Sequence, residues 1–142
     1  RALSVAHRMG LDIETLTWKP ADSSSNIEAA RRLAAADVVI STLPAGAADP
    51  LAVPMRQALD RADGTRTGAV MLDVVYAPWP TALAQAWGRG GGSVAPGWLM
   101  LLHQAVPQVQ LMTGQQPDIE DMRAALRSEL DPTSTTPVGS DD

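Results

Sequence analysis

The chain contains no cysteine and no phenylalanine, one tyrosine and two histidines in 142 residues. Without cysteine it can form neither disulfides nor thiolate metal sites, an absence that fits a cytoplasmic protein. The two histidines, His7 and His103, lie far apart in the sequence and have no neighbouring ligands at metal-binding spacing. We therefore expect no metal site.

Basic clusters and long apolar runs are also missing. The formal net charge is −5, so a nucleic-acid partner is not expected. No apolar run approaches the ~20 residues needed to span a bilayer, so we expect no membrane partner. Apolar residues make up 45% of the chain and charged residues 19%, a balance typical of one globular domain.

The chain starts with Arg1 and not with methionine. The first residues have the apolar spacing of an amphipathic helix that ends at Gly10. Because a domain rarely begins within such an element, we expect an upstream part to be absent from this sequence.

Strand-like and helix-like segments then alternate along the chain. Strands are expected at residues 11–18, 37–43, 69–76 and 93–95. Helices are expected at 27–36 (capped by Ser25 or Asn26), 53–62, 81–87, 97–113 and 118–130. This order predicts an α/β fold, an incomplete doubly wound and mostly parallel sheet of Rossmann type with helices on both faces and two C-terminal helices. Residues 63–68 read as a loop, and 131–142, which have no apolar period, as a disordered tail.

Isolated polar groups end two apolar segments, where open α/β sheets bind their ligands. Tyr76 follows a buried strand, and its hydroxyl either bonds a substrate oxygen or lies in water at the sheet edge. Asp73 lies inside the same strand, and hydrogen bonds to backbone N–H groups at a neighbouring helix start are its preferred explanation, because a buried carboxylate needs partners. Ser41 and Thr42 end another strand, where a hydroxyl contacts a cofactor or begins a turn.

The helix expected at 97–113 carries a second set of candidates. The Gln104 amide suits a polyol or carboxylate substrate, although a solvated polar stripe explains it equally simply. His103 has a weaker case, and Met100 has the spacing of a core residue. The glycines at 90–92 follow a helix and precede a strand, the opposite order to a phosphate-binding loop, so they read as a turn.

Taken together, the two segments resemble the C-terminal, cofactor-binding half of the shikimate dehydrogenases. The family pattern D-x-x-Y-x-P-x-x-T is filled by Asp73, Tyr76, Pro78 and Thr81. The pattern G-x-x-M-L-x-x-Q-A is filled by Gly97, Met100, Leu101, Gln104 and Ala105, and Gly114 ends the helix. The segment DVVISTLPAG is similar to the strand of that family that carries Ser or Thr beside the nicotinamide. The resemblance covers residues 1–130.

The resemblance implies an oxidoreductase that interconverts 3-dehydroshikimate and shikimate with NADPH in chorismate biosynthesis. The residues it assigns to the substrate are Tyr76 and Gln104. The residues it assigns to the cofactor are Thr42, Leu43, Val74, Gly97 and Met100. Glycine at position 97 would allow a close backbone approach beside the nicotinamide. No catalytic residue is assigned within this chain.

Several parts of the family pattern are not in this sequence. They are the glycine-rich pyrophosphate turn, the Asn-Arg-Thr stretch for the 2′-phosphate, and the N-terminal substrate domain with its catalytic Lys–Asp pair. Lys19, the only lysine, follows the first expected strand and is not that lysine. We therefore expect the chain alone to be inactive and to need the substrate domain as its partner. Pro107 should kink the helix after Gln104, at a cost of ~3 kcal/mol.

Two other interpretations stay open. The chain is alternatively a non-catalytic binding module that keeps the half-fold and meets a partner through its exposed sheet edge. A third interpretation is a paralogue that uses quinate or NAD, since the residues that select the cofactor are not in this chain. A sheet without its first βα unit should be marginally stable and prone to association, which leaves a homodimer open.

Overall fold

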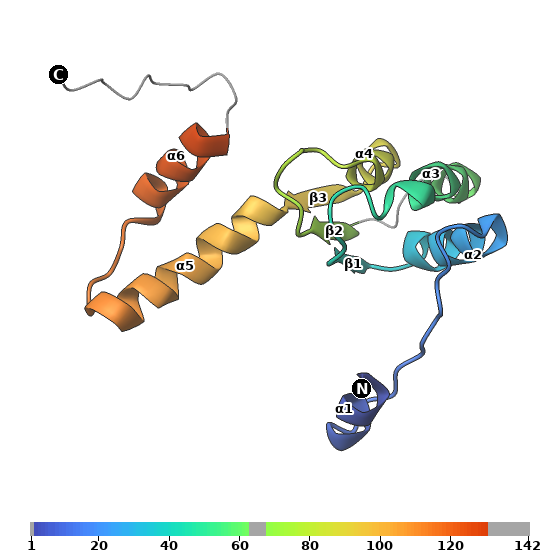
Figure 1. The fold of residues 1–142 in the computed structure, drawn as a ribbon, viewed down its shortest axis with the longest axis horizontal. Coiled ribbons are helices and arrows are strands. Elements are labelled where there is room, and N and C mark those ends of the chain that lie inside the picture. Colours follow the sequence, from blue (N-terminus) through green and yellow to red (C-terminus); the bar gives the residue numbers. More distant parts are fainter. Residues whose placement is uncertain (1, 63–67, 131–142) are drawn as a thin grey trace.

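A computed structural model describes residues 2–62 and 68–130 (Figure 1). Its helices are α1 (Ala2–Arg8), α2 (Ser23–Ala34), α3 (Ala52–Arg61), α4 (Ala82–Arg89), α5 (Gly97–Thr113) and α6 (Ile119–Leu130), with a short 3₁₀ turn at Asp49–Leu51. Its strands are β1 (Val38–Ser41), β2 (Val70–Asp73) and β3 (Ser93–Pro96). Most of the expected loop at 63–68 and the whole expected tail at 131–142 lie outside the described residues.

The three strands form one parallel sheet in the order β1-β2-β3. Each step from strand to strand passes through a helix, first α3 and then α4. This confirms the α/β class, the parallel pairing and the Rossmann-like half-fold. Buried apolar side chains from the strands and from α2, α3 and α4 form one core, and the largest are Met55, Leu59, Met71, Leu83 and Trp87.

In the part of the chain that the structure describes, helices cover one face of this sheet only. Helices α2, α3 and α4 pack side by side over the face that carries Val39 and Met71 (Figure 1). On the other face Val38 and Ile40 are 65% and 62% exposed. The expectation of helices on both faces is therefore wrong for the described residues. Because both crossovers step in the same direction along the sheet, right-handed connections put both helices on the same side.

The strand expected at 11–18 is also wrong. This segment has no regular secondary structure, and most of it is exposed. It is tied to α2 instead, where Arg32 Nη1 donates to Glu14 Oε2 at 2.8 Å and Trp18 Nε1 donates to Asn26 Oδ1 at 2.7 Å. Its alternating pattern satisfied the rule for a strand, but a strand also needs a neighbour to accept its backbone hydrogen bonds.

Helix α2 starts earlier than expected, at Ser23, and neither Ser25 nor Asn26 caps it. Asp22 is the N-cap, and its Oδ1 accepts from the backbone nitrogens of Ser24 at 2.9 Å and Ser25 at 3.3 Å. An aspartate at this position offers a charged acceptor to the first free N–H groups of the helix.

Helices α5 and α6 form a hairpin that extends away from the sheet (Figure 1). They pack against each other, and α5 also touches β3, from which it continues directly. Helix α5 is not broken at Pro107 and ends at Gly114, whose φ of 70° suits glycine. Within the described residues, no helix is both long and apolar enough to cross a membrane.

Candidate functional site

The carboxyl ends of the three strands meet at one edge of the sheet. The register pairs Ser41 with Asp73, and Asp73 with Pro96. The next residue of each strand is one of the predicted cofactor residues Thr42, Val74 and Gly97. The backbone confirms that they are neighbours, since Val74 N donates to Ser41 O at 3.0 Å. The fold thus brings together three residues that are 55 positions apart from first to last.

Gly97 is required by a backbone contact within the chain. A Cβ built on Gly97 would lie 2.9 Å from the Val74 Cα and would overlap the Val74 carbonyl group. The sequence suggested that glycine leaves room for the nicotinamide. The structure shows a reason within the chain as well, because the Val74 backbone lies against Gly97 and a side chain would keep the start of α5 from seating against the end of β2.

Asp73 is buried, with 1% of its surface exposed, and it organises the loop that carries Tyr76. Its Oδ2 accepts from Thr81 Oγ1 at 2.6 Å, and its Oδ1 accepts from Val75 N at 3.3 Å. Thr81 in turn caps α4, because its Oγ1 accepts from Ala84 N at 3.1 Å. The preferred structural role is therefore correct, but the partners are one local backbone N–H and the cap hydroxyl, not the N–H groups of the helix start.

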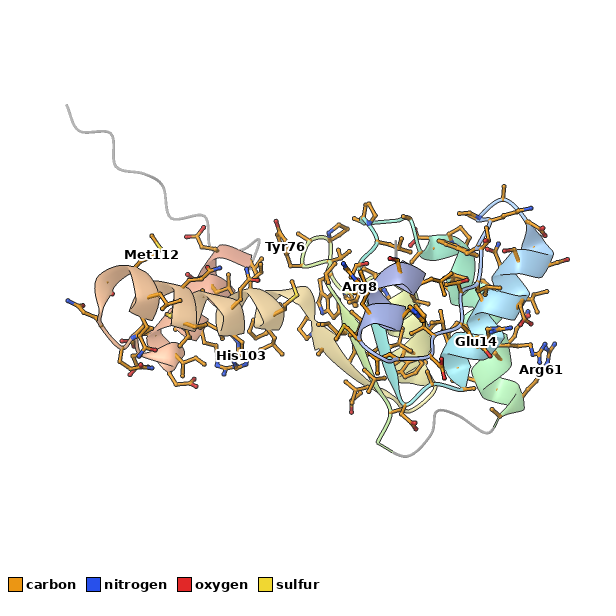
Figure 2. All side chains as sticks on the ribbon, turned by 90° about the horizontal axis from the view of Figure 1, so that it is seen from below. Arg8, Glu14, Arg61, Tyr76, His103 and Met112 are labelled. Carbon is orange, nitrogen blue, oxygen red and sulfur yellow. The ribbon has the colours of Figure 1, made fainter. Side chains whose placement is uncertain are left out.

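Tyr76 is 49% exposed and lines an open cleft with a volume of about 790 Å³. The other residues that line it are Ala77, Pro78, Trp79, Trp98, Arg127 and Leu130. The cleft lies between the loop after β2 and the α5–α6 hairpin. Figure 2 shows Tyr76 near the start of α5.

Gln104 is exposed on α5 and does not line this cleft. It shares a helix face with Gly97 and Met100 by i, i+3 and i+7 spacing. Seven residues of helix put it ~10 Å along the axis from Gly97. The cleft that Tyr76 lines among the described residues therefore does not include Gln104. His103 lies on the other side of α5 from Tyr76 (Figure 2).

Thr42 and Leu43 line a second cavity, of about 350 Å³, at the open edge of β1. Its walls combine core side chains such as Val39 and Leu83 with Trp18, Glu14 and Arg32. Arg32 also donates to Glu28 Oε1 at 2.9 Å. This hydrogen bond holds the pKa of Glu28 below its ordinary value, and the Glu28 and Glu14 carboxylates together raise the pKa of Arg32.

The sequence did not single out Trp98 or Arg127, which face each other in the Tyr76 cleft. The Arg127 Cζ atom lies 5.4 Å from the centre of the Trp98 ring. Trp98 adjoins Gly97 in a recognised motif, but no local pattern links it to a residue of α6. Among residues 2–62 and 68–130, no cluster of His, Asp or Glu side chains could hold a metal ion.

Parallel strands joined by crossover helices, with the candidate residues at their carboxyl ends, define one half of a doubly wound, dinucleotide-binding type of α/β domain. Residues 97–127 match the family described as shikimate 5'-dehydrogenase C-terminal domain. The chain belongs to the shikimate dehydrogenase family and corresponds to the C-terminal part of its members.

Individual relatives agree with this assignment. A shikimate dehydrogenase (NADP(+)) of Ruegeria sp. is 34% identical over 121 residues, which cover 84% of this chain and 38% of that protein. The protein of the same name from Bacillus subtilis is 37% identical over 103 residues, which cover 72% of this chain and 35% of that protein. The crystal structure of Mycobacterium tuberculosis shikimate dehydrogenase superposes with a TM-score of 0.63 at 34% identity. That match covers 89% of this chain and 41% of the solved one, so the chain spans about two-fifths of the length of these relatives.

Proposed function

We propose that this chain is the nicotinamide-facing part of a cytoplasmic NADP-dependent shikimate dehydrogenase. The complete enzyme interconverts 3-dehydroshikimate and shikimate in chorismate biosynthesis. The names of the relatives support the reaction and the cofactor. The observation that carries the proposal is the single sheet edge that unites Thr42, Val74 and Gly97.

The residues at this edge fit the nicotinamide end of the cofactor. Thr42 offers an exposed hydroxyl and Met100 an exposed apolar side chain, both near the backbone of Val74 and Gly97. The nearby carboxylate of Asp73 is engaged within the chain, so it is not free to contact a ligand. Among the described residues, the turn from β1 to α3 contains the single glycine Gly46 and not the glycine-rich sequence that cradles a pyrophosphate, so we assign the phosphates to another part of the enzyme.

When bound, NADPH supplies the hydride, and this chain orients the cofactor and the substrate. In this proposal the Tyr76 hydroxyl and the Gln104 amide bond the oxygens of the substrate. The hydrogen bonds of Asp73 to Val75 N and Thr81 Oγ1 hold the two ends of the loop that carries Tyr76. Because Gln104 lies two helical turns beyond the sheet edge, the substrate domain would lie against the α5 face that carries Met100 and Gln104.

The chain alone should not catalyse the reaction. Lys19 is its only lysine, and the residue is exposed just before α2. Without a general acid for the developing alkoxide, the rate should fall by roughly 10²–10⁴. Residues 1–130 would then act as one domain of a larger enzyme.

A chimera tests the proposal. Residues 1–130 would replace the matching segment of the Mycobacterium tuberculosis enzyme, and shikimate-dependent reduction of NADP⁺ would be measured. We expect activity from the chimera and none from the isolated chain. In the chimera, Gln104→Ala should lower kcat/KM by about 3- to 10-fold, the effect of one lost hydrogen bond.

The matched control is Gln110→Ala, which removes an exposed amide from a different face of α5 and should leave kcat/KM unchanged. A folded chimera that binds NADP⁺ but does not oxidise shikimate would contradict the proposal. Ordinary activity of the isolated chain would contradict the proposal that the general acid lies in another part of the enzyme.

A further inference from the structure

The loop that carries Tyr76 is held by hydrogen bonds at its two ends. At its start Val74 N donates to Ser41 O at 3.0 Å, and at its end Thr81 begins α4 as the N-cap. Within the described part of the chain, no hydrogen bond involves the backbone or the side chains of residues 76–79. Tyr76 is itself half exposed, so packing holds it on one side only. The place of the Tyr76 hydroxyl therefore depends on the bonds at the loop ends.

The Thr81 hydroxyl makes two hydrogen bonds at the end of this loop. It donates to Asp73 Oδ2 at 2.6 Å and accepts from Ala84 N at 3.1 Å. The first bond joins the loop end to the last residue of β2, and the second joins it to the first turn of α4. Asp73 Oδ1 also accepts from Val75 N, which directly precedes Tyr76. A chain of hydrogen bonds thus runs from α4 through Thr81 and Asp73 to the neighbour of Tyr76.

A hydroxyl suits this position because it donates one hydrogen and accepts another. Without the Thr81 hydroxyl, one oxygen of Asp73 would lose its partner while that residue is only 1% exposed. A buried carboxylate oxygen without a partner is costly, so the loop would move to bring another donor or water to it. Capping of α4 alone would explain the bond to Ala84 N, but not the short bond to a buried carboxylate on β2.

We propose that Thr81 is a positioning residue that acts on the reaction through Tyr76. It holds the loop between β2 and α4 in the shape that directs the Tyr76 hydroxyl at the substrate, and it needs no contact of its own with substrate or cofactor. This inference rests on the proposed function, in which the Tyr76 hydroxyl bonds a substrate oxygen.

The first test uses the full 142-residue chain, in which Tyr76 is the only tyrosine. An isotope-labelled tyrosine ring therefore gives signals from one residue, and their NMR relaxation reports the motion of that ring. Thr81→Val keeps the shape of the side chain without its hydroxyl, and should make the ring more mobile. Thr81→Ser keeps the hydroxyl and should leave the ring as it is. The indole N–H signal of the buried Trp87, which donates to Ser93 O at 3.1 Å, shows whether each variant is folded.

Thr113 offers a matched control, because its hydroxyl makes a similar pair of bonds. Its Oγ1 donates to Val109 O at 2.8 Å and accepts from Gln115 N at 3.1 Å, at the end of α5 far from the sheet. Thr113→Val should therefore leave the ring signals unchanged. Asp73→Asn removes one of the two acceptor oxygens while keeping the shape of the side chain. This variant should also make the Tyr76 ring more mobile, and it decides the question if Thr81→Val does not fold.

The second test measures the reaction in the chimera described above. Thr81→Val should lower kcat/KM for shikimate by about 3- to 10-fold, the effect of one misplaced hydrogen bond from Tyr76. The KM for shikimate should rise, a change that a smaller folded fraction would not produce, while the KM for NADP⁺ should stay the same. Thr81→Ser should keep the activity. In a Tyr76→Phe background, Thr81→Val should lower kcat/KM by less than about 2-fold more, because residues that act through one group are not additive.

Unchanged ring mobility in the folded Thr81→Val and Asp73→Asn variants would overturn the inference. Equal losses from Thr81→Val and Thr81→Ser would also overturn it, as would a loss from Thr81→Val that is the same with and without the Tyr76 hydroxyl. A folded chimera without activity would contradict the proposed function and, with it, the step from Tyr76 to the substrate. The ring measurements in the isolated chain would still decide whether Thr81 positions Tyr76, so the two failures are distinguishable.

Discussion

Two single residues, one at the end of β2 and one at the start of α5, position the backbone of the candidate site. Asp73 holds the loop after the strand through Val75 N and Thr81 Oγ1. Gly97 lets the first turn of α5 meet the Val74 backbone at a distance that no side chain would allow. Both residues belong to recognised motifs, yet the contacts that explain them lie within the protein. A motif position therefore need not touch the ligand in order to be essential to the site.

Gly97→Ala should destabilise the chain by ~1–3 kcal/mol, because the new methyl group would meet rigid backbone and force α5 to shift. The measurement is the midpoint of urea unfolding. Gly88→Ala is the matched control, since its Cβ would lie 3.8 Å from Val94 Cγ2, an ordinary contact. Within α4 this change should stabilise the chain by ~0.5–1 kcal/mol. Equal midpoints for the two variants would contradict this account of Gly97.

At the scale of elements, α5 carries candidate site residues and also a proline that destabilises the helix. It carries the candidate residues Gly97, Met100 and Gln104, and it also contains Pro107. Proline removes one backbone donor and crowds the carbonyl one turn before it. The helix nevertheless continues to Thr113. Because Pro107 is exposed, no core packing offsets its cost.

Pro107→Ala should therefore stabilise α5 locally, by ~1–3 kcal/mol, since the backbone hydrogen bond is restored and the steric conflict is removed. Hydrogen exchange of the amides of 97–113 measures this directly, because the hairpin extends from the sheet and can open separately from it. Gln108→Ala, the exposed neighbour, should change the protection by only a few tenths of a kcal/mol. Unchanged protection in Pro107→Ala would show that the proline costs the helix nothing.

At the scale of the whole molecule, the helices of residues 2–62 and 68–130 cover one face of the sheet and leave the other face open. Its exposed face carries Val38 and Ile40, and the cavity of about 350 Å³ opens at the edge of β1. An uncovered apolar face beside an unpaired strand edge favours association with another chain. This agrees with the chain spanning about two-fifths of the length of its relatives.

We expect the isolated chain to associate in a concentration-dependent way through this face. Sedimentation velocity over a range of concentrations measures the association. Ile40→Thr, which removes apolar surface while keeping a β-branched side chain, should reduce it. Val53→Thr changes a residue of similar exposure, 57%, on α3 and should have no effect. A sharp, concentration-independent monomeric melt of the unchanged chain would count against the prediction.

Much of the fold follows from local pattern alone. The apolar runs at 37–43 and 69–76 contain β1 and β2. The periodic segments at 97–113 and 118–130 contain α5 and α6, and the segment at 53–62 matches α3 to within one residue at each end. Local pattern was insufficient at 11–18, where apolar and polar residues alternate but no neighbouring strand pairs with the segment. It was also insufficient at the start of α2, where a stronger cap lies a few residues upstream at Asp22.

The amino-acid sequence by itself determined the α/β class, the order of the elements from α2 onward and the motif residues of the candidate site, because periodicity, turn residues and short spacing are local properties of the chain. Only the tertiary structure decided which contacts those residues make. The Val74 backbone against Gly97 and the Arg127 guanidinium over the Trp98 ring join segments 23 and 29 residues apart. The Thr81 hydroxyl on Asp73 spans only eight residues, but it depends on where the loop after β2 meets the start of α4. Such contacts depend on crossover direction and on helix packing, which no local pattern records.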